Sequence, residues 1–215
     1  SITPIASLAS TINTMIESTK EAADDVSEEI DEETIEDIQA GLQTIFKRSN
    51  GLIHFVQTYR NLTKIPKPNF KIFQICKLFE SIQILMKEEF KNTSLKLSTE
   101  VNPPDLELTA DEQLIEQVLI NLVKNAFHAL EHQKDGQISL KAYISIRGQL
   151  TISVTDNGPG ILPDVLDKIF IPFFTTKKSG SGIGLSLSRQ IVRLHGGTLT
   201  AKSEPGVETS FSMRF

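Results

Sequence analysis

Two asparagines in the second half of the chain have the spacing of a metal site. Asn121 and Asn125 lie four residues apart in a helical pattern, so both amides project from the same face of the expected helix. Asparagine oxygen is a hard, neutral ligand that suits Mg²⁺, an ion that usually keeps several waters and shares itself with substrate phosphates. A core hydrogen-bond network made by a buried asparagine pair is the alternative interpretation.

A second candidate segment, Asp156-Asn157-Gly158-Pro159-Gly160, directly follows an expected strand. The Asp156 carboxylate could accept a hydrogen bond from an exocyclic amine such as that of adenine. Gly158 and Gly160 would allow the backbone to approach a ligand closely. An ordinary turn is the alternative, because Asn-Gly and Pro-Gly are frequent turn pairs.

A third candidate segment runs from Phe170 to Lys177 and holds three phenylalanines within five residues. Aromatic rings are costly to expose, so we expect them to dock a mobile loop. Lys177 would then reach a terminal phosphate as a point charge. A hydrophobic core plug followed by a solvated lysine is the alternative.

The fourth candidate segment is glycine-rich and precedes an expected helix. It reads Gly180-Ser181-Gly182-Ile183-Gly184-Leu185. It matches neither the dinucleotide-binding fingerprint nor the P-loop. Free amides and the positive end of the helix would still suit an anion there.

The elements that must position these segments predict an α+β fold, an α/β sandwich with mostly antiparallel strands. Apolar spacing of three and four predicts helices, and alternation predicts strands. Helices are expected near 72–90, 111–131 (after Thr109 as N-cap) and 183–195, and strands near 95–101, 106–108, 138–147, 150–155, 198–203 and 209–214.

The first part of the chain predicts a different architecture. An apolar a/d pattern continues from Ile35 to Tyr59, and a shorter one precedes it from Ile5 to Met15. Two helices joined by an acidic turn would form an antiparallel hairpin, which buries its stripe as a four-helix bundle in a homodimer. Burial of the stripe against the following domain is the alternative.

Prolines set the expected domain boundary. Pro66 and Pro68 end the second helix, because proline lacks the amide donor and disfavours helix before it. We therefore expect a helical hairpin in 1–62, a linker in 63–68 and a second domain in 69–215.

Composition narrows the class of protein. The chain has 215 residues, of which 39% are hydrophobic and 23% charged, which is close to the average for globular proteins. A single cysteine excludes an internal disulfide framework, and the four scattered histidines do not have zinc-ligand spacing. The net charge of −5 argues against non-specific nucleic-acid binding. No membrane span or signal peptide is apparent, so we expect a cytoplasmic protein.

The four segments, in this order and spacing, resemble the N, G1, F and G2 boxes of the sensor histidine kinase ATP-binding domain. This fold is shared with type II topoisomerase, chaperone and mismatch-repair ATPases, and the resemblance covers about 70–215. It includes Glu208-Thr209-Ser210-Phe211, which is similar to the family's terminal Gly-Thr-x-Phe strand except that Glu208 replaces the glycine.

The resemblance implies that ATP and Mg²⁺ are the cofactors. By that similarity Asn125 would ligate Mg²⁺, with Asn121 and Lys124 on the phosphate side. Asp156 would bind adenine, helped by Gly158, Gly160 and Thr209. Residues 161–181 would form a flexible lid, from which Lys177 and the segment from Gly180 through Ser181, Gly182, Ile183 and Gly184 to Leu185 would close on the phosphates.

The resemblance also implies the reaction. Hydrolytic members carry a glutamate base at the position of Asn121, and an asparagine cannot take a proton, so transfer to a protein nucleophile is expected rather than ATP hydrolysis. The intact protein would phosphorylate a histidine and pass the group to an aspartate of a response-regulator receiver domain. A non-catalytic nucleotide-binding scaffold and a hydrolytic ATPase are the alternative functions.

The acceptor histidine is expected to lie outside this chain. Ser1-Ile2-Thr3-Pro4-Ile5 resembles the end of the family's His-Glu-x-x-Asn/Thr-Pro-Leu-type motif, so the histidine would lie just before Ser1. None of His54, His128, His132 and His195 fits that motif. Any membrane attachment would come from regions missing from this chain.

Overall fold

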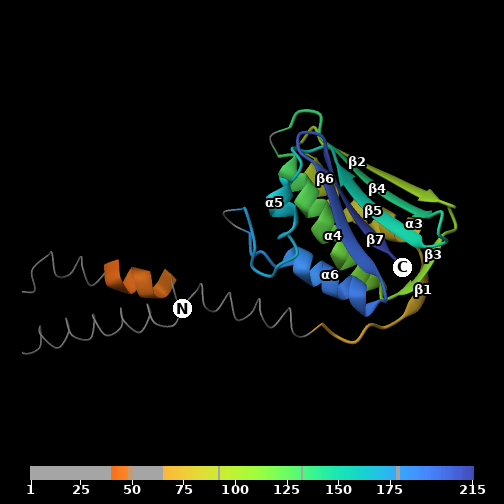
Figure 1. The fold of residues 1–215 in the computed structure, drawn as a ribbon, viewed down its shortest axis with the longest axis horizontal. Coiled ribbons are helices and arrows are strands. Elements are labelled where there is room, and N and C mark those ends of the chain that lie inside the picture. The colour runs from red at the N-terminus through yellow and green to blue at the C-terminus, as the bar shows by residue number, and fades with distance from the viewer. Residues whose placement is uncertain (1–39, 48, 50–64, 92, 132, 178–179) are drawn as a thin grey trace, which may run out of the picture. The chain divides into compact units, whose positions relative to one another are not determined.

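The computed structural model describes residues 40–47, 49, 65–91, 93–131, 133–177 and 180–215 (Figure 1). The chain divides into two units, 1–63 and 64–215, and each is described by itself. In the first unit, residues 40–47 and 49 are helical and fall within the second helix of the expected hairpin. The rest of that hairpin, including His54, lies outside the described residues.

A five-stranded sheet forms the frame of the second unit, with the strand order β2-β4-β5-β7-β6. β2 runs parallel to β4 and the other neighbours are antiparallel, while β1 and β3 form a separate antiparallel pair. The elements are β1 (Lys71–Gln74), α3 (Ile75–Phe90), β2 (Lys96–Asn102), β3 (Glu107–Ala110), α4 (Glu112–Ala129), β4 (Gln137–Ile144), β5 (Leu150–Asp156), α5 (Pro163–Leu166), α6 (Gly184–Leu194), β6 (Thr198–Glu204) and β7 (Glu208–Arg214). This mixed α/β architecture confirms the fold class expected for residues 69–215.

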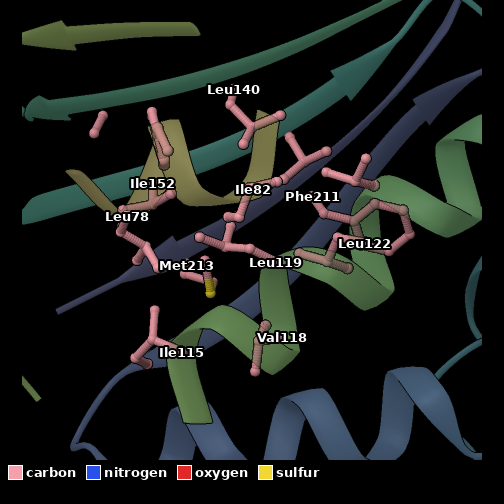
Figure 2. Packing of buried hydrophobic residues seen from close by; sticks show 14 of the residues in the cluster. Leu78, Ile82, Ile115, Val118, Leu119, Leu122, Leu140, Ile152, Phe211 and Met213 are labelled. Atoms are coloured by element: carbon pink, nitrogen blue, oxygen red, sulfur yellow. The ribbon is translucent and has the colours of Figure 1, made fainter. Parts of the chain in front are cut away.

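The core lies between one face of this sheet and the helices α3, α4 and α6. Alternate strand residues point into it, and helix residues three or four positions apart cover them, as the labelled side chains in Figure 2 show. Leu78 and Ile82 come from α3, Ile115, Val118, Leu119 and Leu122 from α4, and Leu140, Ile152, Phe211 and Met213 from the strands. This packing holds α4, which carries both asparagines, against the sheet.

Two details near the start of the unit differ from the sequence-based expectation. The helix expected from residue 72 begins at Ile75, because Ile72 and Phe73 pair with β3 instead. The helix expected after Thr109 is capped by Asp111, whose Oδ1 accepts the Leu114 N–H at 3.2 Å. Backbone pairing between distant segments is not visible in local periodicity. The starts of α3 and α4 therefore differ from the expected ones.

Asp111 also fastens the incoming chain and the end of α6 to the start of α4. Its Oδ2 accepts the Asn69 N–H at 2.8 Å, and these amide hydrogen bonds lower the pKa of the Asp111 carboxyl. The Asp111 N–H donates to His195 Nε2 at 3.1 Å, and His195 Nδ1 bonds to the Ile191 carbonyl at 2.8 Å. The Phe70 ring lies 5.2 Å from the His195 ring.

No helix among the described residues combines the length and the apolar character needed to cross a bilayer.

Candidate functional site

At one end of the sheet, the row of residues that faces the helices is apolar in β2 and β4 but polar in β5, β7 and β6. The strand register aligns Leu97, Ile138, Asp156, Thr209 and Ser203 across β2, β4, β5, β7 and β6. Paired residues of neighbouring strands point to the same face, here the one that the helices cover. Asp156 is only 3% exposed and Thr209 only 5%. Burial of polar groups at this edge of the core indicates a site built for a polar ligand.

The Asp156 carboxyl is held in an environment that disfavours its charge. Burial raises its pKa to about 6, the nearby Glu208 adds to the shift, and the Gly158 N–H opposes it by donating to Oδ1 at 3.0 Å. A Cβ on Gly158 would lie 2.6 Å from the same oxygen, so only glycine permits this approach. Among the described residues, the second carboxyl oxygen of Asp156 forms no hydrogen bond and is available to a ligand.

Gly160 fits the loop after Asp156 against the β6–β7 turn. Its φ is +72°, and a Cβ there would lie 2.5 Å from the Glu204 carbonyl oxygen. The Gly206 N–H donates to the Pro159 carbonyl at 2.8 Å, and the Ile161 N–H donates to Ser203 Oγ at 2.8 Å. The glycines expected to let the backbone approach a ligand therefore also lock this loop to the sheet.

Asn157 has a structural role that the sequence analysis missed. Its Oδ1 accepts the Gln137 N–H at 2.7 Å, its Nδ2 donates to the Asp135 carbonyl at 3.1 Å, and its own carbonyl accepts from Gln133 Nε2 at 2.9 Å. An asparagine beside glycine is a common turn signal. That signal indicated the turn but not its partners, which lie about 20 residues earlier.

Asn121 links α4 to the first turns of α6. Its Nδ2 donates to Ser188 Oγ at 3.0 Å, and Ser188 is 2% exposed. A Cβ on Gly184 would collide with Asn121 Oδ1, so this glycine is what lets α6 begin directly beside the amide. The core hydrogen-bond interpretation of the asparagine pair thus applies to Asn121.

Asn125 contacts a cation from the loop that precedes α6. Lys177 Nζ donates to Asn125 Oδ1 at 3.2 Å, across 52 positions of sequence. Partial burial lowers the pKa of the Lys177 ammonium, and the carboxylate of Glu131 opposes that shift. The Asn125 oxygen is therefore placed to accept a positive charge, as the metal-ligand interpretation requires.

Lys124 is not brought to this cluster. Its ammonium pairs with Glu89 of α3 at 2.9 Å, with both side chains close to half exposed. The neighbours in sequence, Lys124 and Asn125, thus serve different surfaces of α4.

The loop between α5 and α6 is anchored at both ends. Ile169 is buried, and the half-buried Phe170 ring packs edge-on against Phe211 at 6.4 Å, with the Arg189 guanidinium 4.1 Å above its face. At the other end the Phe173 N–H donates to the Gly182 carbonyl at 2.9 Å. Phe170 therefore docks the loop as expected, whereas the Phe173 side chain is 39% exposed, contrary to the expectation.

Gly182 and the start of α6 complete the phosphate side of the candidate site. Gly182 has a φ of +68°, and a Cβ there would lie 2.5 Å from the Phe173 carbonyl carbon. α6 follows with Ile183 in the N-cap position, where no side chain caps the helix. The first amides of an α-helix have no intrahelical partner, so this end suits an anion. Ser181 is exposed beside it.

The residues present fit ATP and fit one protein ligand for Mg²⁺. The buried Asp156 acceptor suits an amino group, and the Lys177 ammonium with the uncapped α6 suits phosphates. Asn125 Oδ1 already accepts a cation, and Mg²⁺ takes its remaining ligands from phosphates and water. In the part of the chain that the structure describes, no group of three or more His, Cys, Asp or Glu side chains is placed to hold a metal without such help.

Comparison with known proteins shows the family to which the second unit is similar. Residues 110–215 match the family described as histidine kinase-, DNA gyrase B-, and HSP90-like ATPase. Over 129 residues the chain is 38% identical to the sensor histidine kinase ZraS of Salmonella typhimurium (strain LT2), covering 60% of this chain and 27% of ZraS. The catalytic domain of histidine kinase ThkA has 31% identity and a TM-score of 0.61, with 68% of this chain and 97% of that domain covered.

A second solved structure extends the likeness over the whole chain. It is histidine kinase ThkA in complex with response regulator protein TrrA, with 26% identity, a TM-score of 0.61, and 100% of this chain and 59% of that chain covered. The chain belongs to the sensor histidine kinase family, and its second unit is a catalytic domain of that family. It spans only about a quarter of the length of its curated relative ZraS.

Proposed function

We propose that this chain is the ATP-binding transmitter portion of a protein-histidine kinase in a two-component system. The observation that carries the proposal is that one domain holds both a buried acceptor, Asp156, and a separate Asn125–Lys177 pair with one positive charge. An adenine would occupy the first and the phosphates the second. The family relationship supports this assignment.

Each site residue receives one role in this proposal. Asp156 and Thr209 bind the base, while Gly158 and Gly160 hold their loop against it. Mg²⁺ bound at Asn125 would supply charge neutralisation at the phosphates. Lys177 leaves Asn125 and stabilises the developing charge on the γ-phosphoryl group. The amides at the start of α6 position that phosphoryl group.

Asn121 favours phosphoryl transfer over ATP hydrolysis. A carboxylate at this position would be needed to activate water, and an amide cannot serve as that base. Here the amide is also committed to Ser188 Oγ at 3.0 Å, which supports a positioning role between α4 and α6.

We propose a response-regulator receiver domain as the partner and the cytoplasm, where ATP is available, as the location. The ThkA–TrrA complex supports the first proposal. The acceptor histidine would lie just upstream of Ser1, in the motif whose end resembles residues 1–5.

A homodimer through residues 1–62 is part of the proposal. The heptad stripe from Ile35 to Tyr59 is too apolar to leave in water. Light scattering is expected to find the 215-residue chain dimeric, while residues 69–215 alone are monomeric and still bind ATP. A monomeric full chain would contradict the bundle.

Labelling with γ-³²P-ATP tests the reaction. The 215-residue chain is expected to bind ATP without labelling itself, because transfer requires the acceptor nitrogen in line with the γ-phosphorus. An N-terminal extension that restores His-Glu-x-x-Asn is expected to give an acid-labile, alkali-stable label. Release of free phosphate would indicate an ATPase, and ATP binding with neither product would indicate a scaffold. If the 215-residue chain labels itself and His54→Ala abolishes this label, His54 is the acceptor.

A further inference from the structure

We propose that Ser203 fixes the direction of the Thr209 hydroxyl and so makes the base pocket, the proposed adenine site at Asp156 and Thr209, a set of hydrogen-bond acceptors. This pocket accepts an amino group and rejects a carbonyl. The inference rests on the proposed nucleotide site and assigns to it a specificity-determining residue. Ser203 has no charge and no place in the family-like motifs of the sequence. Its contacts alone single it out.

Three groups surround Ser203 Oγ, and together they use all of its hydrogen-bonding capacity. The Ile161 N–H lies at 2.8 Å, the Glu208 carbonyl oxygen at 2.8 Å and Thr209 Oγ1 at 3.0 Å. A hydroxyl has one hydrogen to donate and two lone pairs that accept. The Glu208 carbonyl can only accept, so the Ser203 hydrogen goes to it, and the Ile161 N–H takes one lone pair.

The remaining contact is then determined by elimination. Ser203 has only a lone pair left for Thr209, so the Thr209 hydroxyl must donate its hydrogen to Ser203. The lone pairs of Thr209 Oγ1 remain, and toward the rest of the pocket this oxygen is only an acceptor.

Asp156 presents the same polarity beside it. The two residues are direct partners in the β5–β7 ladder and point to the same face of the sheet. The ionised Asp156 carboxylate is also only an acceptor, and its Oδ1 is taken by the Gly158 N–H.

Two adjacent acceptors match one ligand chemistry. The exocyclic amine of adenine carries two hydrogens and can satisfy both acceptors, directly or through a water. A base with a carbonyl oxygen at that position would place a third acceptor against them and leave buried groups unpaired. A site built in this way rejects the wrong group more strongly than an apolar pocket does.

Ser203 also holds the loop, which must be separated from its effect on polarity. The bond from Ile161 fixes the residue after Gly160, so Ser203→Ala is expected to loosen this loop and to lower nucleotide affinity in general. A change in the preference between two bases that depends on the Thr209 hydroxyl is a readout that this loosening would not produce.

The experiment compares ATP with inosine triphosphate, whose base has a carbonyl oxygen in place of the amine, by calorimetry with magnesium on the 215-residue chain. Ser203→Ala frees the Thr209 hydroxyl to donate, so the preference for ATP is expected to fall by about tenfold. Ser203→Thr keeps a hydroxyl and is expected to keep most of the preference.

Two further variants make the test specific. In a Thr209→Val background there is no hydroxyl to orient, so Ser203→Ala is expected to change the preference no further. Ser210→Ala is the matched control: it removes a similar hydroxyl pair, with Thr155 at 2.9 Å, from the opposite face of the β5–β7 ladder, and is expected to leave the preference unchanged.

The outcomes separate the two proposals. A wild-type chain that binds neither triphosphate overturns the proposed function, and the inference with it. A wild-type chain that prefers ATP, together with a Ser203→Ala variant that retains this preference, overturns the inference alone. An equal loss of preference with Ser203→Ala in the Thr209→Val background would assign the effect to the loop instead.

Discussion

Replacing Asp156 by asparagine is expected to stabilise the nucleotide-free domain while it weakens the binding of adenine nucleotides. The carboxyl is almost fully buried, and its pKa is raised from 3.8 to about 6, so its negative charge costs free energy in the unliganded fold. An amide oxygen can still accept the Gly158 N–H. We expect a gain of roughly 1–3 kcal/mol in the free energy of unfolding at neutral pH.

Binding is expected to respond in the opposite direction. The amide that Asp156→Asn introduces would present a donor as well as an acceptor to the base, and a mispaired buried group costs about 1–3 kcal/mol of affinity. Discrimination between ATP and GTP should decline with it. A variant that keeps both affinity and preference would return Asp156 to the role of a turn residue.

The pH dependence gives the same prediction a second readout. A carboxyl whose pKa is higher in the folded state contributes stability that is present below the unfolded value of 3.8 and is lost as pH rises through about 6. The melting temperature of the wild type should therefore carry a decline over this range that Asp156→Asn lacks. ATP affinity should rise over the same range as the carboxylate ionises.

Asp105→Asn is the matched control. This carboxyl is exposed in the β2–β3 connection, away from the polar row. This variant is expected to keep the ATP affinity of the wild type and the same decline of the melting temperature with rising pH. If Asp156→Asn melts at a lower temperature than the wild type at neutral pH, the account of a buried, unfavourable charge is wrong.

Asn125→Ala is expected to abolish the magnesium-dependent part of ATP binding and to leave the fold intact. The side chain supplies a neutral oxygen that already accepts a hydrogen bond from a cation, the Lys177 ammonium at 3.2 Å. In calorimetry, the wild type should bind ATP more tightly with magnesium than with EDTA, and the variant should bind with the EDTA affinity in both conditions.

Two comparisons make this result interpretable. Gln117→Ala changes an exposed side chain elsewhere on α4 and should retain the magnesium effect. Asn125→Asp would place a carboxylate against Lys177, and this ion pair should hold the lysine away from phosphates and weaken ATP binding as well. An unchanged affinity with magnesium in Asn125→Ala would remove this residue from the site.

The sequence predicted the elements of the second unit well, because each has a strong periodic pattern of its own. It missed β1, whose four residues are extended only because β3 pairs with them. The candidate site could be proposed from Asn125, Asp156 and the glycines, since these residue types are unusual in a helix face and at a strand end, and its assignment stays a prediction. The division of roles was not, because it depends on contacts such as those of Lys124 with Glu89 and Asn121 with Ser188.

Ser203 marks the limit of local reasoning in another way. In the β6–β7 hairpin, Glu204 pairs with Glu208, so Ser203 must face Thr209 once the turn at 205–207 is recognised. Pro205 and Gly206 give that signal, and the register could have been counted from it. The direction of the hydrogen bond from Thr209 to Ser203 could not be predicted from the sequence, because it depends on where the Ile161 amide lies.

The attachment of Asn69 to Asp111 has a mechanical consequence. The segment that enters the second unit is tied to the first turn of α4, the helix that carries Asn125 about 20 Å further along its axis. An α-helix is stiff along that axis. A force on residues 65–69 is therefore expected to displace α4 as a rigid body. His195 passes the same force to the end of α6 through the Asp111 amide. A force on residues 65–69 therefore acts on both α4 and α6. Their facing residues, Asn121 and Ser188, adjoin the phosphate side of the proposed site.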